Sequence, residues 1–213
     1  MKAVFLDRDG VINKLIYHHD HGIIDSPFTI EQFSLINGVG QAIKELREND
    51  YKAILVSNQP GIAKGFFSRD TFQKIRKRML NLLAVSGTGL DGEYYCLHHP
   101  EAVIPKLRTS CECRKPKPGL LLKAAREMDI DLSISWMVGD GLTDVQAGKE
   151  AGCRTVLISR MKCELCEMMN KLDAVPDFIA PNLAEAAQYI LMKGEQQWKS
   201  SLIQRVSTTS KNG

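Results

Sequence analysis

Short apolar runs recur along the chain and end at polar or glycine-containing turns. Each run holds two to four aliphatic or aromatic residues; the runs cover residues 3–6, 53–56, 94–97, 136–138, 155–158 and 178–179. Apolar runs of this length, bounded by turn residues, predict buried strands.

The stretches between these runs carry apolar residues at helical spacing. The clearest example is residues 69–85, where one face holds Phe72, Ile75 and Met79. Further helices are predicted at residues 40–49, 119–128, 144–151 and 183–192. Alternating strands and helices predict an α/β protein with a parallel sheet covered on both faces, which is a three-layer α/β/α arrangement.

The composition describes a folded globular protein and not a disordered chain, with 44% hydrophobic and 25% charged residues. Its 213 residues predict one domain over residues 1–193. Residues 194–213, rich in Gln, Ser, Thr and Lys, predict a polar C-terminal tail. A net charge of +3 disfavours a dedicated nucleic-acid binder.

Targeting signals are not evident in the sequence. No apolar run approaches the roughly 18 residues that a membrane span requires. Asp7 interrupts any hydrophobic segment of a signal peptide. We therefore expect a cytoplasmic, monomeric protein without a membrane or nucleic-acid partner.

Polar residues gather where the predicted strands end. Asp7 and Asp9 follow the first run, Ser57 the second, and Asp140 the fourth, while Lys115 stands before a predicted helix. The carboxyl ends of parallel strands share one edge of the sheet, so these side chains are expected to meet. Carboxylates from Asp7 and Asp140 suit Mg²⁺.

This set fits phosphoryl chemistry. A phosphoryl group about 4 Å from a carboxylate is repelled by about 4 kcal/mol at an effective dielectric near 20, which Lys115 and a metal would offset. Asp7 could attack phosphorus to form an aspartyl-phosphate, with Asp9 as general acid and base and Ser57 binding a phosphoryl oxygen. Separately, each has an ordinary explanation as a solvated turn or helix cap. Their joint placement at strand ends favours the chemical interpretation.

The segments that carry these residues resemble the four motifs of the haloacid dehalogenase-like (HAD) phosphohydrolases. The matching segments are residues 7–13, 56–65, 113–116 and 137–140. The resemblance covers about residues 2–185 and is greatest to the branch of heptose-bisphosphate and histidinol phosphatases. It implies a Rossmann-like fold with a minimal cap, Mg²⁺ dependence and an aspartyl-phosphate route.

The same resemblance implies a role for each motif residue. Asp7 is the nucleophile and Asp9 the general acid and base. Asp7, Asp140 and the backbone carbonyl of Asp9 hold magnesium, while Ser57 and Lys115 bind phosphate.

Three cysteines and a histidine fall within 18 residues: Cys96, His98, Cys111 and Cys113. Three thiolates and one imidazole form a closed tetrahedral set typical of structural zinc, although buried free thiols are the alternative. The resembling branch carries such a zinc loop, which would hold Arg114 and Lys115 toward the phosphate. Cys163 and Cys166 are interpreted as packing residues, and Cys153 as a core residue.

Further candidates concern substrate recognition. The predicted substrate-binding residues are Asp20, His21, Asn58, Gln59 and Arg114. In the resembling family an Asp-His-Gly stretch in the loop of residues 14–27 contacts substrate. The guanidinium of Arg114 could hold a second anionic group in a fork.

Two features bear on the choice of substrate. The twelve residues between His98 and Cys111 resemble the heptose-bisphosphate type. Gly141, however, stands where those enzymes usually have lysine. The leading hypothesis is a phosphatase acting on the C7 phosphate of D-glycero-D-manno-heptose 1,7-bisphosphate.

Other interpretations remain open from the sequence. They are a phosphatase for histidinol phosphate or another small phosphomonoester, and a non-enzymatic, zinc-stabilised phosphosugar-binding module. The basic residues of the predicted helix 69–85 would suit nucleic acid, but aromatic residues are not interleaved with them, and a solvated helix face is the simpler explanation.

Overall fold

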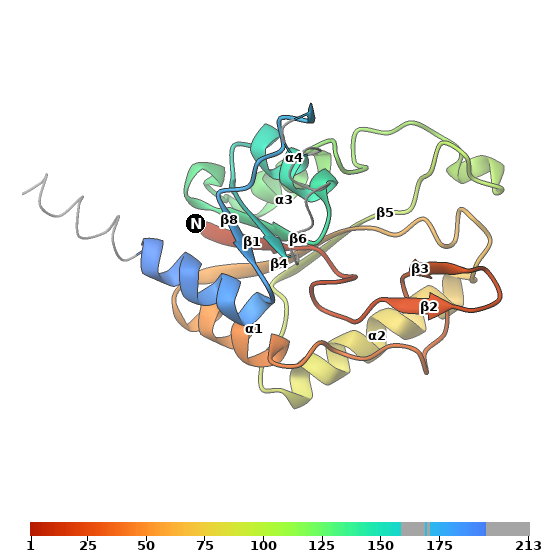
Figure 1. Ribbon diagram of the computed structural model, residues 1–213, viewed down its shortest axis with the longest axis horizontal. Coiled ribbons are helices and arrows are strands. Elements are labelled where there is room, and N and C mark those ends of the chain that lie inside the picture. The colour runs from red at the N-terminus through yellow and green to blue at the C-terminus, as the bar shows by residue number, and fades with distance from the viewer. Residues whose placement is uncertain (159–168, 170, 195–213) are drawn as a thin grey trace, which may run out of the picture.

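The computed structural model describes residues 1–158, 169 and 171–194. Six parallel strands form one sheet in the order β5-β4-β1-β6-β7-β8 (Figure 1). Their bounds are β1 (Lys2–Leu6), β4 (Tyr51–Asn58), β5 (Gly92–Cys96), β6 (Trp136–Gly139), β7 (Arg154–Ile158) and β8 (Phe178–Ala180). The strand order reverses at β1, because β4 and β6 flank it on opposite sides. Ligands of such sheets bind beyond the carboxyl ends at this switch point.

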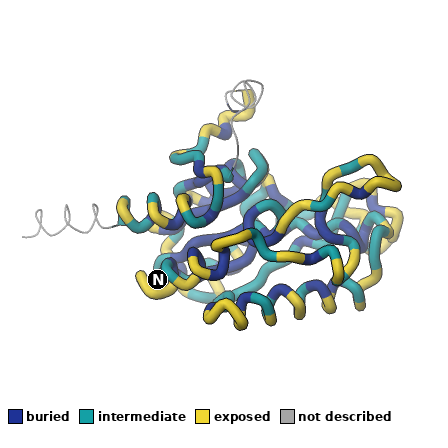
Figure 2. Tube along the Cα trace, turned by 60° about the horizontal axis from the view of Figure 1, so that its bottom comes forward, coloured by how far each residue is buried: buried dark blue, intermediate teal, exposed yellow. Residues whose placement is uncertain are grey.

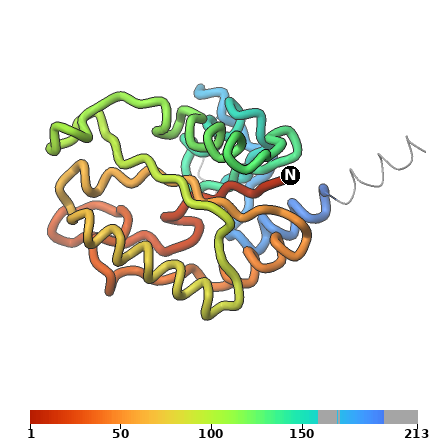
Figure 3. The backbone as a smooth tube through the Cα atoms, turned by 180° about the vertical axis from the view of Figure 1, so that it is seen from behind, coloured from red at the N-terminus to blue at the C-terminus, as the bar shows by residue number. Residues whose placement is uncertain are grey.

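Helices cover both faces of the sheet, as the sequence predicts. α1 (Val39–Glu48), α2 (Arg69–Val85) and the helix of residues 183–194 lie on one side, and α3 (Gly119–Met128) and α4 (Leu142–Glu150) on the other (Figure 3). Two short 3₁₀ turns, η1 (Pro105–Leu107) and η2 (Leu132–Ile134), complete the elements. The three-layer fold is confirmed.

Successive side chains of β1 point to opposite faces of the sheet and pack into two separate cores. Val4 and Leu6 pack into the core beneath α1 and α2, whereas Ala3 and Phe5 pack against α3 and α4. All four are fully buried, because a strand covered on both faces exposes neither set of side chains. Figure 2 shows these buried strands enclosed by helices whose outer faces are exposed.

A small hairpin was not predicted. β2 (Ile16–His18) and β3 (Ile23–Asp25) pair antiparallel within the segment interpreted as a loop. Strands of three residues with a polar turn give too little periodicity to recognise. One face of the hairpin remains exposed, including the cross-strand pair Tyr17 and Ile24.

The helical backbone described after β8 runs over residues 183–194, so Gly194, the first residue of the predicted tail, is helical. The domain boundary itself stays a prediction. The rest of the tail, together with Cys163 and Cys166, lies outside the described residues. No helix in the described part of the chain is long and apolar enough to cross a membrane.

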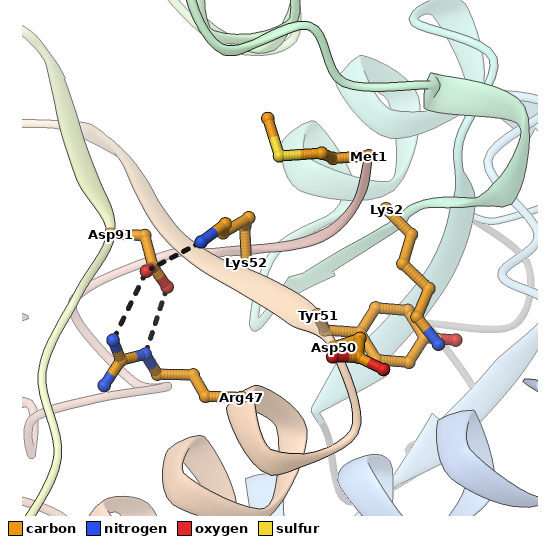
Figure 4. Close-up of a pocket in the computed structure, with 7 residues that line it drawn as sticks. All are labelled: Met1, Lys2, Arg47, Asp50, Tyr51, Lys52 and Asp91. Atoms are coloured by element: carbon orange, nitrogen blue, oxygen red, sulfur yellow. Dashed lines mark hydrogen bonds and ion pairs between the residues drawn. The ribbon is translucent and has the colours of Figure 1, made fainter.

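A hollow of about 440 Å³ opens at the amino ends of β1 and β4 (Figure 4). On its wall, Asp91 accepts hydrogen bonds from Arg47 at 3.1 and 3.3 Å and lies 3.5 Å from the Lys52 ammonium. Lys2 also lines the hollow, and its ammonium lies over the Tyr51 ring, 4.1 Å from the ring centroid. These contacts tie α1, β4 and the start of β5 together.

Candidate active site

Asp7 lies directly beyond β1, at the switch point of the sheet. Its backbone N–H donates to the Val138 carbonyl at 3.0 Å, so the β1–β6 ladder continues one residue past the strand. The Lys115 ammonium lies 3.1 Å from Asp7 Oδ1 and donates to the Val56 carbonyl at 2.9 Å. A second carboxylate, that of Asp144, lies 2.5 Å from the same ammonium. Lys115 is thus a buried cation between two acids.

The electrostatics of this cluster favour an additional cation. Burial raises the pKa of Asp7 to about 6, although Lys115 opposes the shift. Burial, with the Asp7 and Asp144 charges, raises the pKa of Asp140 to about 7. For Lys115, burial lowers the pKa, but Asp144 and Asp7 outweigh it and raise the pKa above its usual value. A divalent cation would favour the ionised carboxylates.

The carboxylates of Asp7, Asp140 and Asp144 are close enough to surround an ion, with ligand atoms within 4.8 Å of one another. Asp144 already uses both oxygens, on Lys115 and on the Gly141 N–H at 3.1 Å, where it caps α4. Asp7 and Asp140 therefore remain as hard oxygen ligands, a donor set that suits Mg²⁺.

Gly10, in the turn after β1, lies directly against the Asp140 carboxylate. Its φ of 77° lies in the left-handed region that favours glycine. A Cβ at this position would overlap the Asp140 carboxylate. The turn after β1 can therefore lie this close to Asp140 only if residue 10 has no side chain.

The Asp9 carboxylate is held by three neighbours. Its Oδ1 accepts from Arg8 Nε at 3.3 Å, Arg8 Nη2 at 3.1 Å and Asn13 Nδ2 at 2.9 Å. Its Oδ2 accepts from Gln59 Nε2 at 2.6 Å, and the same nitrogen donates to Ser57 Oγ at 3.1 Å. The structure thus joins the predicted acid–base residue to the predicted phosphate-binding hydroxyl.

Asn58 connects β4 to the Lys115 segment. Its Nδ2 donates to the Lys115 carbonyl, and its Oδ1 accepts from the Lys115 N–H, both at 3.0 Å. In the structure both polar atoms of the Asn58 amide bond the Lys115 backbone, and the substrate contact that the sequence predicts for Asn58 stays a prediction. The contact with Lys115 joins residues 57 positions apart, and no local pattern reveals it.

The predicted zinc ligands also converge. Cys111 Sγ lies 3.1 Å from Cys113 Sγ and 3.5 Å from Cys96 Sγ, and His98 Nδ1 lies 3.5 Å from Cys113 Sγ. A tetrahedron with Zn–S bonds of about 2.3 Å has ligand–ligand edges of about 3.8 Å, so the four groups fit a zinc ion. Burial raises the pKa of Cys96; for Cys111 burial also raises it, but hydrogen bonds with Cys113 and Cys96 outweigh this and lower the pKa to about 7.

The loop that carries these ligands rests on the segment after β4. The N–H groups of Val103 and Ile104 donate to the Ala63 carbonyl at 2.8 and 3.3 Å. Arg114 is half-buried and donates from Nη1 to the His98 carbonyl at 3.3 Å. The loop therefore joins the cysteine cluster to the segments that hold Ser57 and Lys115.

Asp20 and His21 lie exposed at the turn of the β2–β3 hairpin. The His21 ring lies 5.8 Å from that of Phe66, which stacks on Phe28 at 4.6 Å. Figure 1 shows the hairpin and the loop after β5 on the same side, beyond the carboxyl ends of the strands. Both residues thus belong to the hairpin on that side of the sheet, and neither is among the groups of the carboxylate cluster.

Three of the five basic residues of α2 are paired within the molecule. Lys74 pairs with Asp70 at 2.7 Å, and Arg76 donates to Glu93 at 2.6 and 2.9 Å. Arg78 donates to the Phe33 carbonyl at 3.2 Å. These contacts tie the basic face of α2 to its own helix, to β5 and to the segment of Phe33.

Comparisons with known proteins agree with this geometry. A family model described as HAD-hydrolase-like matches residues 112–186. A D-glycero-beta-D-manno-heptose-1,7-bisphosphate 7-phosphatase of Photorhabdus laumondii is 46% identical over 74% of this chain and 80% of its own length. The Escherichia coli K12 protein of the same name is 38% identical over 88% and 93%. The D,D-heptose 1,7-bisphosphate phosphatase of B. bronchiseptica, solved with magnesium and phosphate, matches with a TM-score of 0.73 and 31% identity over 91% of this chain and 99% of that one.

Proposed function

The chain belongs to the family of D-glycero-beta-D-manno-heptose-1,7-bisphosphate 7-phosphatases, and from this membership we propose that it hydrolyses the C7 phosphate of a heptose 1,7-bisphosphate. The protein is a HAD-type phosphatase. The observation that carries the proposal at the level of the site is the buried Asp7–Lys115–Asp144 cluster at the switch point of the sheet. It combines a nucleophile with a fixed positive charge.

In the proposed reaction, Asp7 attacks phosphorus and the bond to the leaving sugar oxygen breaks. Asp9 donates a proton to that oxygen and later accepts one from the water that hydrolyses the aspartyl-phosphate. The phosphoryl oxygens are stabilised by Lys115, by Ser57 and by backbone N–H groups of the turn after β1. The Asn58 amide holds the Lys115 backbone at the end of β4, so the Lys115 ammonium is already in position before the reaction.

Magnesium fits the remaining carboxylates. Asp7 and Asp140, with the carbonyl of Asp9, would hold it, and the raised pKa values of both acids support a cation there. When bound, Mg²⁺ offsets the negative charge of the transferring phosphoryl group.

Phosphate release from a panel of phosphorylated metabolites tests the proposed substrate. With Mg²⁺ present, we expect the heptose 1,7-bisphosphate to give the highest kcat/KM, and omission of Mg²⁺ to stop turnover. A higher kcat/KM for histidinol phosphate would overturn the substrate assignment. Substrate binding without phosphate release would support the non-enzymatic binding module instead.

We further propose that Cys96, His98, Cys111 and Cys113 hold a structural zinc ion. All four positions are occupied by protein ligands, so this ion would not take part in the chemistry. Through Ala63 and Arg114 it would instead fix the loops that border the phosphate site.

Cys111→Ser is expected to lower the zinc content and the thermal stability of the protein. Loss of a direct ligand should weaken zinc binding by more than the about 10–100-fold typical of an outer-shell substitution. Zinc content by mass spectrometry and a thermal melt measure both effects. Cys153→Ser is the matched control for zinc content, because this thiol is buried but is not one of the four converging groups. Full zinc content in Cys111→Ser would contradict the proposal.

A further inference from the structure

The residues that hold Asp9 share an unusual feature. In the described part of the chain, five buried side-chain atoms lack a hydrogen-bond partner, and three of them are Arg8 Nη1, Asn13 Oδ1 and Gln59 Oε1. These atoms belong to the three side chains that donate to Asp9. A buried polar atom without a partner costs free energy. The arrangement therefore satisfies Asp9 at the expense of its neighbours.

The two oxygens of Asp9 are not equivalent. Oδ1 accepts three N–H groups, two from Arg8 and one from Asn13. Oδ2 accepts one, from Gln59. An ionised carboxylate offers about two lone-pair sites on each oxygen. Oδ1 is therefore saturated, and Oδ2 retains one position.

We propose that Oδ2 is the atom of Asp9 that transfers the proton, and that Gln59 is the positioning residue that aims it. This inference rests on the proposed function, in which Asp9 is the acid and base. In the first step the Asp7–phosphorus bond forms, the bond from phosphorus to the leaving oxygen breaks, and the Oδ2 proton moves to that oxygen. In the second step water attacks phosphorus, its proton passes to Oδ2, and the Asp7–phosphorus bond breaks.

Gln59 also sets the distance between two groups that act on the phosphate. Its Nε2 carries two hydrogens, one directed at Asp9 Oδ2 and one at Ser57 Oγ. Because Ser57 Oγ accepts this bond, its own hydrogen is left to donate, to the Asp7 carboxylate in this structure and to a phosphoryl oxygen in the proposed reaction. Gln59 is 1% exposed, so in this inference it acts through Asp9 and Ser57, and the substrate contact that the sequence predicts for it stays a prediction.

Gln59→Met tests the proposal with a series of phosphate esters whose leaving groups differ in basicity. In a reaction through a covalent intermediate, kcat/KM reports steps up to departure of the leaving group. A sugar phosphate requires protonation of its leaving oxygen, whereas p-nitrophenyl phosphate does not. We expect kcat/KM to fall by about 10–100-fold for the sugar phosphate, and by much less for p-nitrophenyl phosphate.

Control variants separate this role from a structural one. Gln41→Met removes the same amide from the exposed face of α1, where Gln41 donates to Glu45, and should change neither rate. Gln59→Leu also lacks the N–H donors, so it should show the same dependence on leaving group if Gln59→Met fails to fold. An equal loss for all esters in the folded variants would overturn the inference.

Asp9→Asn distinguishes failure of this inference from failure of the proposed function. If Asp9→Asn retains full activity on sugar phosphates, the acid–base role of Asp9 is wrong, and the role of Gln59 falls with it. If Asp9→Asn loses activity selectively on esters with basic leaving groups while Gln59→Met does not, only the role of Gln59 is wrong.

Discussion

Asp7→Asn is expected to lower kcat on the order of 10⁴-fold or more, because an amide cannot attack phosphorus to form the covalent intermediate. The substitution preserves shape and the oxygen that accepts the Arg8 N–H, so the fold should persist. Phosphate release measures the loss. Mass spectrometry of acid-quenched wild-type enzyme should also find the phosphoryl group on the peptide that contains Asp7.

Asp70→Asn provides the matched control, since the Asp70 side chain is exposed on α2 and pairs only with Lys74 in the described structure. It should leave kcat unchanged. Undiminished hydrolysis by a folded Asp7→Asn protein would exclude Asp7 as the nucleophile and with it the proposed reaction.

Lys115→Met is expected to destabilise the fold by about 3–5 kcal/mol, because it leaves buried carboxylates without their counter-charge. The affected groups are Asp7 and Asp144, and the Val56 carbonyl also loses a donor. Urea unfolding measures the difference in free energy. The difference in free energy of unfolding between wild type and Lys115→Met should become smaller at low pH, because protonated carboxyl groups carry no charge for a cation to balance. Phosphatase activity should be lost as well.

Lys117→Met, two residues away, serves as the control. The Lys117 ammonium is partly exposed and pairs with the exposed Glu112. Removal of such a surface pair should change stability by no more than about 1 kcal/mol. If both variants were equally stable, the Lys115 cluster would not contribute to the fold as described.

The sequence was sufficient to predict the parallel sheet and most of the strand-end residues. Strands of a parallel sheet are buried on both faces and read as apolar runs, so the runs at residues 3–6 and 53–56 predicted strands, and both lie in strands of the structure. Because parallel strands end at one edge, the residues that follow β1, β4 and β6 were expected to meet. The carboxylates of Asp7, after β1, and Asp140, after β6, have ligand atoms within 4.8 Å of each other, which agrees with that expectation.

The supporting contacts could not be predicted in the same way. Asn58 anchors Lys115, and Gln59 contacts Asp9, through bonds between segments 50 or more residues apart. The residue type alone does not indicate whether an amide side chain at a strand end binds a substrate or another group of the protein. The short β2–β3 hairpin was missed because three-residue strands owe their pairing to the turn and to aromatic packing on Phe28.

The close approach of Gly10 to Asp140 has a consequence for mutational tolerance. A glycine has no side chain to coordinate an ion, yet any Cβ at this position would displace the Asp140 carboxylate. A saturation scan scored by activity would therefore rank position 10 with the acidic residues. Its intolerance would reflect excluded volume, and only a structure can separate that cause from direct chemistry.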